Sequence, residues 1–294
     1  MAEHDKEERL PGNNVTINLS PLRIVGSKKK LIQKHDLMAY FPECVAYKRF
    51  NEVKNRAINH RRVYAEIFCG SAILFFNLEP TPLYAILNDI DHEIFNFWNV
   101  LHTKYDEFIK ELQYSWCGQD WVEKFSIRTD DVGRALFFYI KNRFSNIIQV
   151  PGKFPKEMEF GNWKAKMDKS RLQIWNYSYK EALEKLNKME YKENDNCMEF
   201  LIYEDPPYYG TESFYKGKFT VQDHDILAKM NHESTHHVIL TYNDCPEVRE
   251  LYKDWHVKEL ENFTTFKWKY QNELLLSNKP FVNRNKKALD VKLF

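Results

Sequence analysis

A short apolar run that ends at two prolines constrains the fold of this chain more than any other stretch. Residues Met198 to Tyr203 have the length of a strand that is covered on both faces. Pro206 and Pro207 have no amide hydrogen and cannot continue a central ladder, so we expect the chain to leave the sheet at Asp205. Ligands of open α/β sheets bind outside the carboxyl ends of the strands. This turn is therefore a candidate site, although Asp and Pro are also common in ordinary turns.

Composition predicts a folded protein with a basic local surface. The chain has 294 residues, of which 43% are hydrophobic and 15% aromatic, so we expect a sizeable core in one large domain or one domain with an insertion. The net charge of +1 gives no global signal for nucleic acid. Between residues 141 and 171, however, eight Lys or Arg residues stand against three acids.

The cysteines and the hydropathy pattern narrow the class of protein. The five cysteines are isolated and odd in number, which argues against a disulfide framework or a zinc cluster. The longest apolar runs are too short to cross a bilayer, and no amino-terminal signal pattern is present. We therefore expect a cytoplasmic protein that needs neither a metal nor a membrane.

A second motif reads as strand, tight turn and helix between Val63 and Leu78. Its turn is Gly70-Ser71-Ala72, whose small side chains would let a ligand lie against the backbone and the amides of the new helix. The next predicted strand, Tyr84 to Leu87, ends in Asn88-Asp89-Ile90-Asp91. Nucleotide-binding folds hold a ribose with an acid at such a position, although Asp89 could equally cap the following helix. The small-residue turn, followed about 20 residues later by an acid at the end of the next strand, favours an adenosyl-containing cofactor.

Near the start of the chain, Gly26 and Ser27 precede three lysines, Lys28 to Lys30, at the beginning of a predicted helix. Three consecutive lysines usually form a solvated face. Alternatively, Gly26 and Ser27 let the backbone approach a ligand while Lys28 meets a polar or anionic group.

The remaining elements predict an α/β sheet with an insertion. One amphipathic helix is expected over residues 91–113 and a second over 132–144, and the stretch 142–171 has no sustained periodicity. We therefore predict a discontinuous catalytic domain, 1–91 and 172–294, and an inserted domain, 92–171. The alternating elements that follow end in two strands in quick succession, which indicates an antiparallel edge. These expected elements are the strands 172–177, 237–242, 255–260 and 273–277 and the helices 179–189, 223–233 and 246–252.

Four motifs occur in one order: Gly26-Ser27-Lys28, Phe68-Cys69-Gly70-Ser71-Ala72, Asn88-Asp89-Ile90-Asp91 and Asp205-Pro206-Pro207-Tyr208. In this order they resemble the Dam-type DNA adenine-N6 methyltransferases over about Pro21 to Asn278. The resemblance implies a Rossmann-like, S-adenosylmethionine-dependent methyltransferase sheet with an inserted, mostly helical target-recognition domain. It also implies double-stranded DNA as partner, extrusion of the target base and a place in DNA modification or restriction-modification.

The resemblance assigns roles to particular residues. The catalytic set is Asp205, Pro206, Pro207 and Tyr208. The cofactor set is Gly26, Lys28, Phe68, Cys69, Gly70, Ser71, Asp89, Ile90, Tyr179 and Asp205. The predicted DNA contacts are Lys141, Arg143, Asn146 and Lys153.

The chemistry of an exocyclic amine explains the catalytic set. The lone pair of this amine is delocalised into the ring, so the Asp205 carboxylate and the Pro206 carbonyl would accept both amine hydrogens and favour a tetrahedral nitrogen. Tyr208 offers a ring face to a base that has left the stack. The sulfonium methyl is already activated, so transfer requires no metal. The same geometry would serve adenine in RNA or the N4 amine of cytosine, and a catalytically idle nucleic-acid-binding relative is a further alternative.

Overall fold

The computed structural model describes residues 20–22, 24, 27–41, 47–51, 56–60, 63–114, 126–144, 157–189, 192–193, 196–197, 200–215, 219–260 and 272–281. Its strands are β1 (Tyr47–Asn51), β2 (Arg56–His60), β3 (Val63–Glu66), β4 (Tyr84–Asn88), β5 (Arg171–Trp175), β6 (Lys192–Glu193), β7 (Asn196–Cys197), β8 (Phe200–Glu204), β9 (His237–Asn243), β10 (His256–Leu260) and β11 (Glu273–Ser277). Its α-helices are α1 (Lys29–His35), α2 (Ile73–Asn77), α3 (His92–Thr103), α4 (Tyr105–Tyr114), α6 (Asp131–Phe144), α7 (Glu157–Asp168), α8 (Tyr179–Lys188), α9 (Val221–His232) and α10 (Pro246–Leu251), with 3-10 turns η1 (Leu37–Tyr40) and η2 (Glu212–Tyr215).

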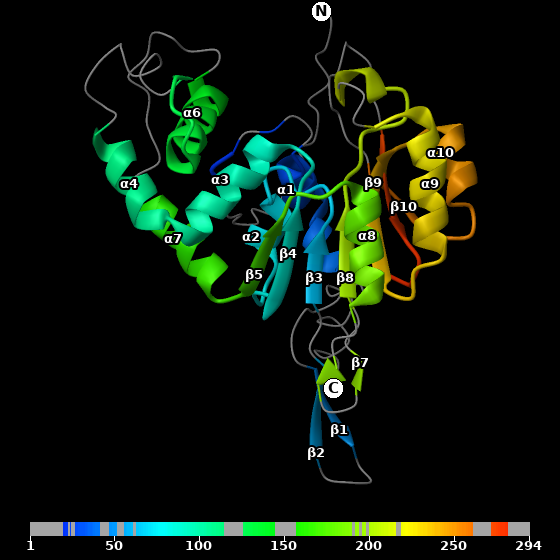
Figure 1. Ribbon diagram of the computed structural model, residues 1–294. Helices are drawn as coiled ribbons and strands as arrows, with labels where there is room; N and C mark the ends of the chain where they lie inside the picture. Colours follow the sequence, from blue (N-terminus) through cyan, green and yellow to red (C-terminus); the bar gives the residue numbers. More distant parts are fainter. Residues whose placement is uncertain are drawn as a thin grey trace, which may run out of the picture.

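Within the described residues, seven strands form one mixed sheet in the order β10-β11-β9-β8-β3-β4-β5 (Figure 1). The pairs β8-β9, β3-β8, β3-β4 and β4-β5 are parallel, and β11 is antiparallel to both β9 and β10. The predicted α/β fold and its antiparallel pair at one edge are confirmed. The strand order reverses between β3 and β8, and open sheets of this kind bind ligands at such a switch point.

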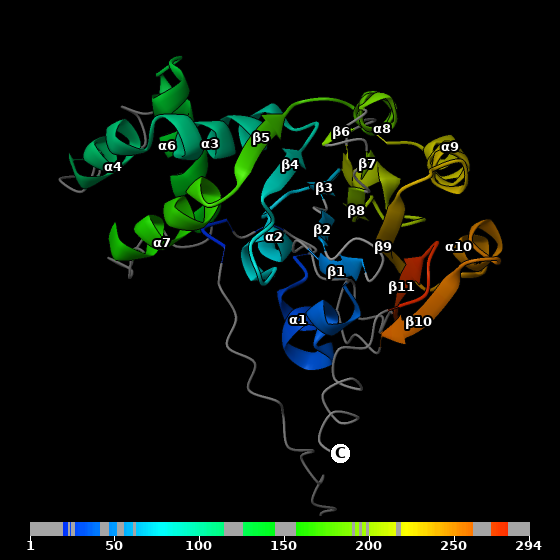
Figure 2. The same cartoon turned by 90° about the horizontal axis from the view of Figure 1, so that it is seen from below.

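Alternate strand residues face two hydrophobic clusters, so the sheet is the middle of three layers. Leu201 and Tyr203 belong to one cluster and Phe200 and Ile202 to the other. Helices α8, α9 and α10 cover the second face, while α1 and α2 lie on the opposite face (Figures 1 and 2). Burial on both faces explains why these strands are continuous apolar runs in the sequence.

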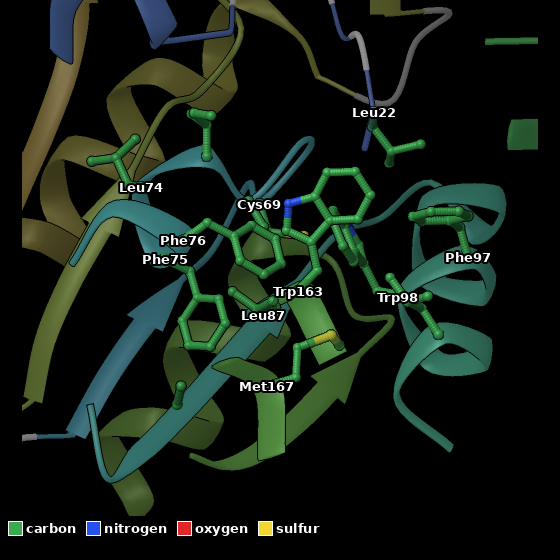
Figure 3. Close-up of a cluster of buried hydrophobic side chains, with 14 of the residues drawn as sticks. Leu22, Cys69, Leu74, Phe75, Phe76, Leu87, Phe97, Trp98, Trp163 and Met167 are labelled. Carbon is green, nitrogen blue, oxygen red and sulfur yellow. The ribbon is translucent and has the colours of Figure 1, made fainter. Parts of the chain in front are cut away.

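The helical group α3, α4, α6 and α7 continues the first cluster beyond β5. Helix α6 packs against α3 and α4, and α7 packs against α3 and β5 (Figure 2). Figure 3 shows Trp98 of this group among Phe76, Phe97 and Trp163, and its ring centroid lies 5.5 Å from that of Phe76. The helical group and the sheet therefore share a core, and the division of the chain at residues 92 and 171 stays a prediction.

One expectation about the helices was wrong. The helix expected over 91–113 is two helices, because the chain breaks at Lys104, which has φ −126° and ψ 35°. The Thr103 hydroxyl donates to the Asn99 carbonyl at 2.7 Å just before the break, and such a bond slightly destabilises and often bends a helix. The apolar spacing runs unchanged across this break and conceals it. The stretch 142–171, which has no sustained periodicity in the sequence, contains α7, and a helix there agrees with the mostly helical insertion that the resemblance implies. Phe160, Trp163 and Met167 of α7 are buried.

No helix among the described residues is long and apolar enough to cross a membrane.

Candidate active site

The site lies at the carboxyl ends of β3, β4, β8 and β9. Since Glu204 is the last residue of β8, the chain leaves the sheet at Asp205, as the two prolines predicted. Pro206 and Pro207 are buried and Tyr208 is partly exposed. Asp205 therefore opens a rigid turn beside the point where the strand order reverses.

Lys28 meets Asp205 in a buried ion pair. Its ammonium nitrogen lies 2.9 Å from Asp205 Oδ1 and 3.5 Å from Glu273 Oε2, and it donates to the Tyr208 hydroxyl at 2.7 Å. Burial acts to lower the pKa of Lys28, but the two carboxylates outweigh it and raise that pKa. Burial raises the pKa of Asp205 to about 6, against the lowering effect of Lys28. At pH 7 the pair is ionised, with Asp205 an acceptor.

Two side chains of β9 hold the turn in place. Asn243 accepts from the Tyr209 amide at 2.9 Å and donates to the Tyr209 carbonyl at 3.1 Å. Thr241 donates to Asp205 Oδ1 at 3.1 Å and lies 2.7 Å from the Tyr203 hydroxyl. The turn after β8 is therefore anchored both at its carboxylate and at the backbone that follows its tyrosines.

The turn after β3 approaches the amino-terminal segment. Gly70 has φ +46°, which favours glycine, and a Cβ added there would lie 3.8 Å from Ile24. The Ser71 hydroxyl lies 3.4 Å from that of Ser27. The structure thus brings the Ser27-Lys28 motif beside both the small-residue turn and the Asp205 turn. Gly26 lies outside the described residues.

Asp89 faces the small-residue turn rather than capping a helix. Its Oδ2 accepts from the Gly70 amide at 2.9 Å and its Oδ1 from the Asp91 amide at 2.9 Å, whereas Asp91 caps α3. The Asn88 amide group donates to the Ile67 and Tyr177 carbonyls at 2.9 and 3.0 Å, which joins the ends of three strands. Ile90 and Tyr177 are both exposed beside this edge, at 41% and 37%.

The other residues of the predicted cofactor set are packing residues in this structure. Phe68 is partly buried and stacks on Tyr179 with centroids 6.0 Å apart. Tyr179 is 6% exposed and its hydroxyl donates to Asp223 Oδ1 at 2.7 Å. Cys69 is buried, and burial raises the pKa of its thiol. The buried Tyr179 ring therefore packs against one face of the Phe68 ring. A cofactor contact by either residue stays a proposal.

The predicted DNA contacts fall on or after α6. Lys141 is exposed and its ammonium nitrogen lies 5.9 Å from the centroid of the Phe137 ring. Arg143 is in the last turn of α6, and the structure describes its backbone but not its side chain. Asn146 and Lys153 lie outside the described residues.

Three functional side chains were not predicted from the sequence. Glu273 begins β11 and is 4% exposed, Thr241 lies within β9, and Glu66 ends β3. Glu66 accepts hydrogen bonds from the Tyr64 hydroxyl and the Phe75 amide at 2.8 and 2.7 Å, and burial raises its pKa to about 8. A polar residue at the beginning or end of an apolar run is the signal that could have identified Glu273 and Glu66, whereas Thr241 stands inside its strand and has no such signal.

The fold and the site define a Rossmann-like methyltransferase. A family model described as D12 class N6 adenine-specific DNA methyltransferase matches residues 26–270, and the chain belongs to that family. The suspected Dam-type resemblance is thereby confirmed.

Solved structures with low identity also match the chain. One is a candidate methylase of Haemophilus influenzae, HI0767, at 14% identity, with 87% of this chain and 91% of that chain covered and a TM-score of 0.33. Another is a candidate RNA methyltransferase of Pyrococcus horikoshii, PH1948, at 12% identity, with 76% and 74% covered and a TM-score of 0.32. A search of curated proteins found no significant match.

Proposed function

We propose that this methyltransferase transfers a methyl group from S-adenosylmethionine to the N6 amine of an adenine extruded from double-stranded DNA. The observation that carries the proposal is the turn at Asp205, whose ionised carboxylate stands at the switch point between β8 and β3. The family match and the sequence motifs support the same activity.

The residues at the ends of β3 and β4 fit such a cofactor. Gly70 leaves backbone space at the turn, and Asp89 is partly exposed beside it, where a carboxylate can accept from ribose hydroxyls. Ile90 and Tyr177 offer exposed apolar surface on the same edge for a purine ring. Lys28 and Ser27 adjoin the turn from the other side, where the amino-acid end would lie. When bound, the cofactor supplies an activated methyl group on a sulfonium.

The residues after β8 would hold the substrate amine. The Asp205 carboxylate and the Pro206 carbonyl accept its two hydrogens and localise the nitrogen lone pair. The partly exposed Tyr208 ring provides a stacking face for the extruded base. Asp205 acts as an acceptor that orients the amine. The helical group that contains α6 would contact the DNA backbone, with Lys141 and Arg143 on phosphates.

The test is Asp205→Ala in a methyl-transfer assay with labelled S-adenosylmethionine and unmethylated genomic DNA. Loss of the acceptor should lower the transfer rate about 100-fold or more, while the cofactor still binds. Asp225→Ala, an exposed acid on α9, is the matched control and should transfer at the wild-type rate.

The same assay separates the alternatives. The labelled base should be N6-methyladenine, and duplex DNA should be a better substrate than single-stranded DNA or RNA. Preference for RNA, or label in N4-methylcytosine, would replace the proposed substrate, and near-normal transfer by Asp205→Ala would remove the role of Asp205.

A further inference from the structure

The Asp205 carboxylate is held at one of its two oxygens. Lys28 Nζ and Thr241 Oγ1 both contact Oδ1, at 2.9 and 3.1 Å. Within the described part of the chain, no hydrogen bond or ion pair ends on Oδ2. The Asp205 side chain is 21% exposed, whereas that of Lys28 is 3% exposed. The described residues thus engage Oδ1 and make no hydrogen bond or ion pair with Oδ2.

The contact from Thr241 has a defined direction. A threonine hydroxyl has one hydrogen, and an ionised carboxylate can only accept, so Thr241 donates to Asp205. The Tyr203 hydroxyl lies 2.7 Å from Thr241 Oγ1 and must therefore be the donor in that pair. Tyr203 is 2% exposed and Thr241 is fully buried. The result is a one-way chain of hydrogen bonds from Tyr203 through Thr241 to Asp205.

We propose that Thr241 and Tyr203 are positioning residues, whose hydrogen-bond chain commits Oδ1 of Asp205 to the protein and turns Oδ2 toward the substrate amine. The inference rests on the proposed function of Asp205 and adds two residues to it. Neither residue touches the reacting atoms. They restrict rotation of the carboxylate so that Oδ2 and the Pro206 carbonyl form a fixed pair of acceptors before substrate binds.

The hydrogen bonds from Tyr203 to Thr241 and from Thr241 to Asp205 also favour the ionised form of the Asp205 carboxylate. Burial raises the pKa of Asp205 to about 6, while Lys28 and the Thr241 hydroxyl lower it. Loss of the Thr241 hydroxyl should therefore raise this pKa further, and the acid limb of methyl transfer should move to higher pH. The titratable groups that act on Asp205 or its neighbours come from the segment before α1, from β3, β8 and β11 and from the turn itself: Lys28, Glu66, Tyr203, Glu273 and Tyr208.

The test compares Thr241→Val, which keeps the shape and removes the hydroxyl, with Thr241→Ser, which restores it. Tyr203→Phe removes the first donor of the chain and leaves Thr241 in place. The Asp205 carboxyl is titrated by carbon-13 NMR, with its signal assigned by Asp205→Asn. Methyl transfer to unmethylated genomic DNA is measured between about pH 5 and pH 9, a range that includes the Asp205 pKa.

Thr241→Val should raise the Asp205 pKa by about 1 unit and slow transfer at pH 7 about 10-fold or more. Thr241→Ser should return the Asp205 pKa and the transfer rate towards their wild-type values. Tyr203→Phe should raise the pKa and slow transfer, but by less than Thr241→Val. Thermal melting shows whether each variant is folded, and if Thr241→Val is not, the comparison of Tyr203→Phe with wild type carries the test.

An Asp205 pKa that is unchanged in the folded variants would overturn the positioning role. A wild-type protein that methylates no nucleic acid would instead overturn the proposed function. The NMR titration does not depend on activity, so the two failures are distinguishable.

Discussion

At the scale of single residues, the site is a group of buried charges that one lysine balances. Lys28 reaches Asp205 at 2.9 Å and Glu273 at 3.5 Å, and the side chains of Lys28 and Glu273 are buried while that of Asp205 is 21% exposed. Breaking a buried pair by removing one partner is costly, because the remaining charge is left uncompensated. Removal of Lys28 alone should therefore destabilise the fold and release the Asp205 carboxylate.

Glu204, next to the candidate acceptor, predicts a pH-dependent stability. It is fully buried, Asn231 donates to its Oε2 at 2.6 Å, and burial raises its pKa to about 8 from the usual 4.5. Because the folded state holds this proton more tightly than the unfolded state, the stabilisation is fully present below pH 4.5. It is lost as the pH rises towards 8, and the free energy of unfolding falls by up to about 5 kcal/mol. Glu204→Gln should remove this loss, so urea unfolding should show the variant gaining on wild type between pH 5 and pH 8.

Glu184→Gln on the exposed face of α8 is the control and should run parallel to wild type. A constant difference between Glu204→Gln and wild type across this pH range would contradict the raised pKa.

At the scale of elements, an asparagine side chain clamps backbone groups at each end of β9: Asn243, the last residue of β9, and Asn278, which follows β11. Asn243 bonds the Tyr209 amide and carbonyl beside the site. At the opposite end, Asn278 accepts from the Val238 amide at 2.9 Å and donates to the His236 carbonyl at 2.8 Å. Each asparagine side chain binds one backbone amide and one backbone carbonyl. Asn243 holds the turn after β8, whereas Asn278 holds the start of β9.

This pair separates stability from catalysis. Asn243→Ala and Asn278→Ala should each lower the free energy of unfolding by about 2 kcal/mol, because each leaves two backbone groups unpaired. Only Asn243→Ala should also slow methyl transfer, since it loosens the turn that carries Asp205 and Tyr208. Unfolding in urea and single-turnover rates measure the two effects. Equal loss of activity in both variants would show that the Asn243 clamp has no special connection with the site.

The break between α3 and α4 shows where element prediction fails. The apolar positions continue at helical spacing through Lys104, so the pattern predicts one helix. The break itself is a change in the backbone angles of Lys104, and both helices pack against α6. The end of a strand at a proline can be predicted from the sequence, because the missing amide hydrogen prevents a ladder bond at that residue itself.

At the scale of the whole molecule, the turn after β3 and the helical group are linked. The indole nitrogen of Trp98 in α3 donates to the Gly70 carbonyl at 2.9 Å, and Figure 3 shows this side chain inside the shared core. A helical group fixed to the sheet in this way can present α6 at a constant position relative to the site. This arrangement suits the proposed division of labour between DNA binding and catalysis.

Lys141 tests that division. If its exposed side chain neutralises a phosphate, Lys141→Ala should weaken binding of duplex DNA uniformly across sequences and reduce the salt slope by about 1. Affinity for S-adenosylmethionine should not change. Lys188→Ala on α8, where the lysine is 80% exposed, is the matched control. Fluorescence anisotropy at several salt concentrations measures the slope, and equal slopes for the two variants would place the DNA elsewhere.

The sequence by itself determined the class of fold, most of the strands and the identity of the two turns. Proline chemistry, small residues in turns and the apolar runs of buried strands all act over a few neighbouring residues, so they can be read locally. Asp205, Gly70 and Asp89 were predicted for this reason, and the structure places all three at one edge of the sheet.

Only the tertiary structure decided which side chains surround Asp205. Thr241 is 36 residues away in sequence, and Lys28 and Glu273 come from opposite ends of the described chain. Their meeting depends on the strand order, which places β9 beside β8 and β11 beside β9, and no local pattern encodes that order. The acid and its turn are properties of the sequence, whereas the orientation and charge of the acid come from residues that the fold assembles around it.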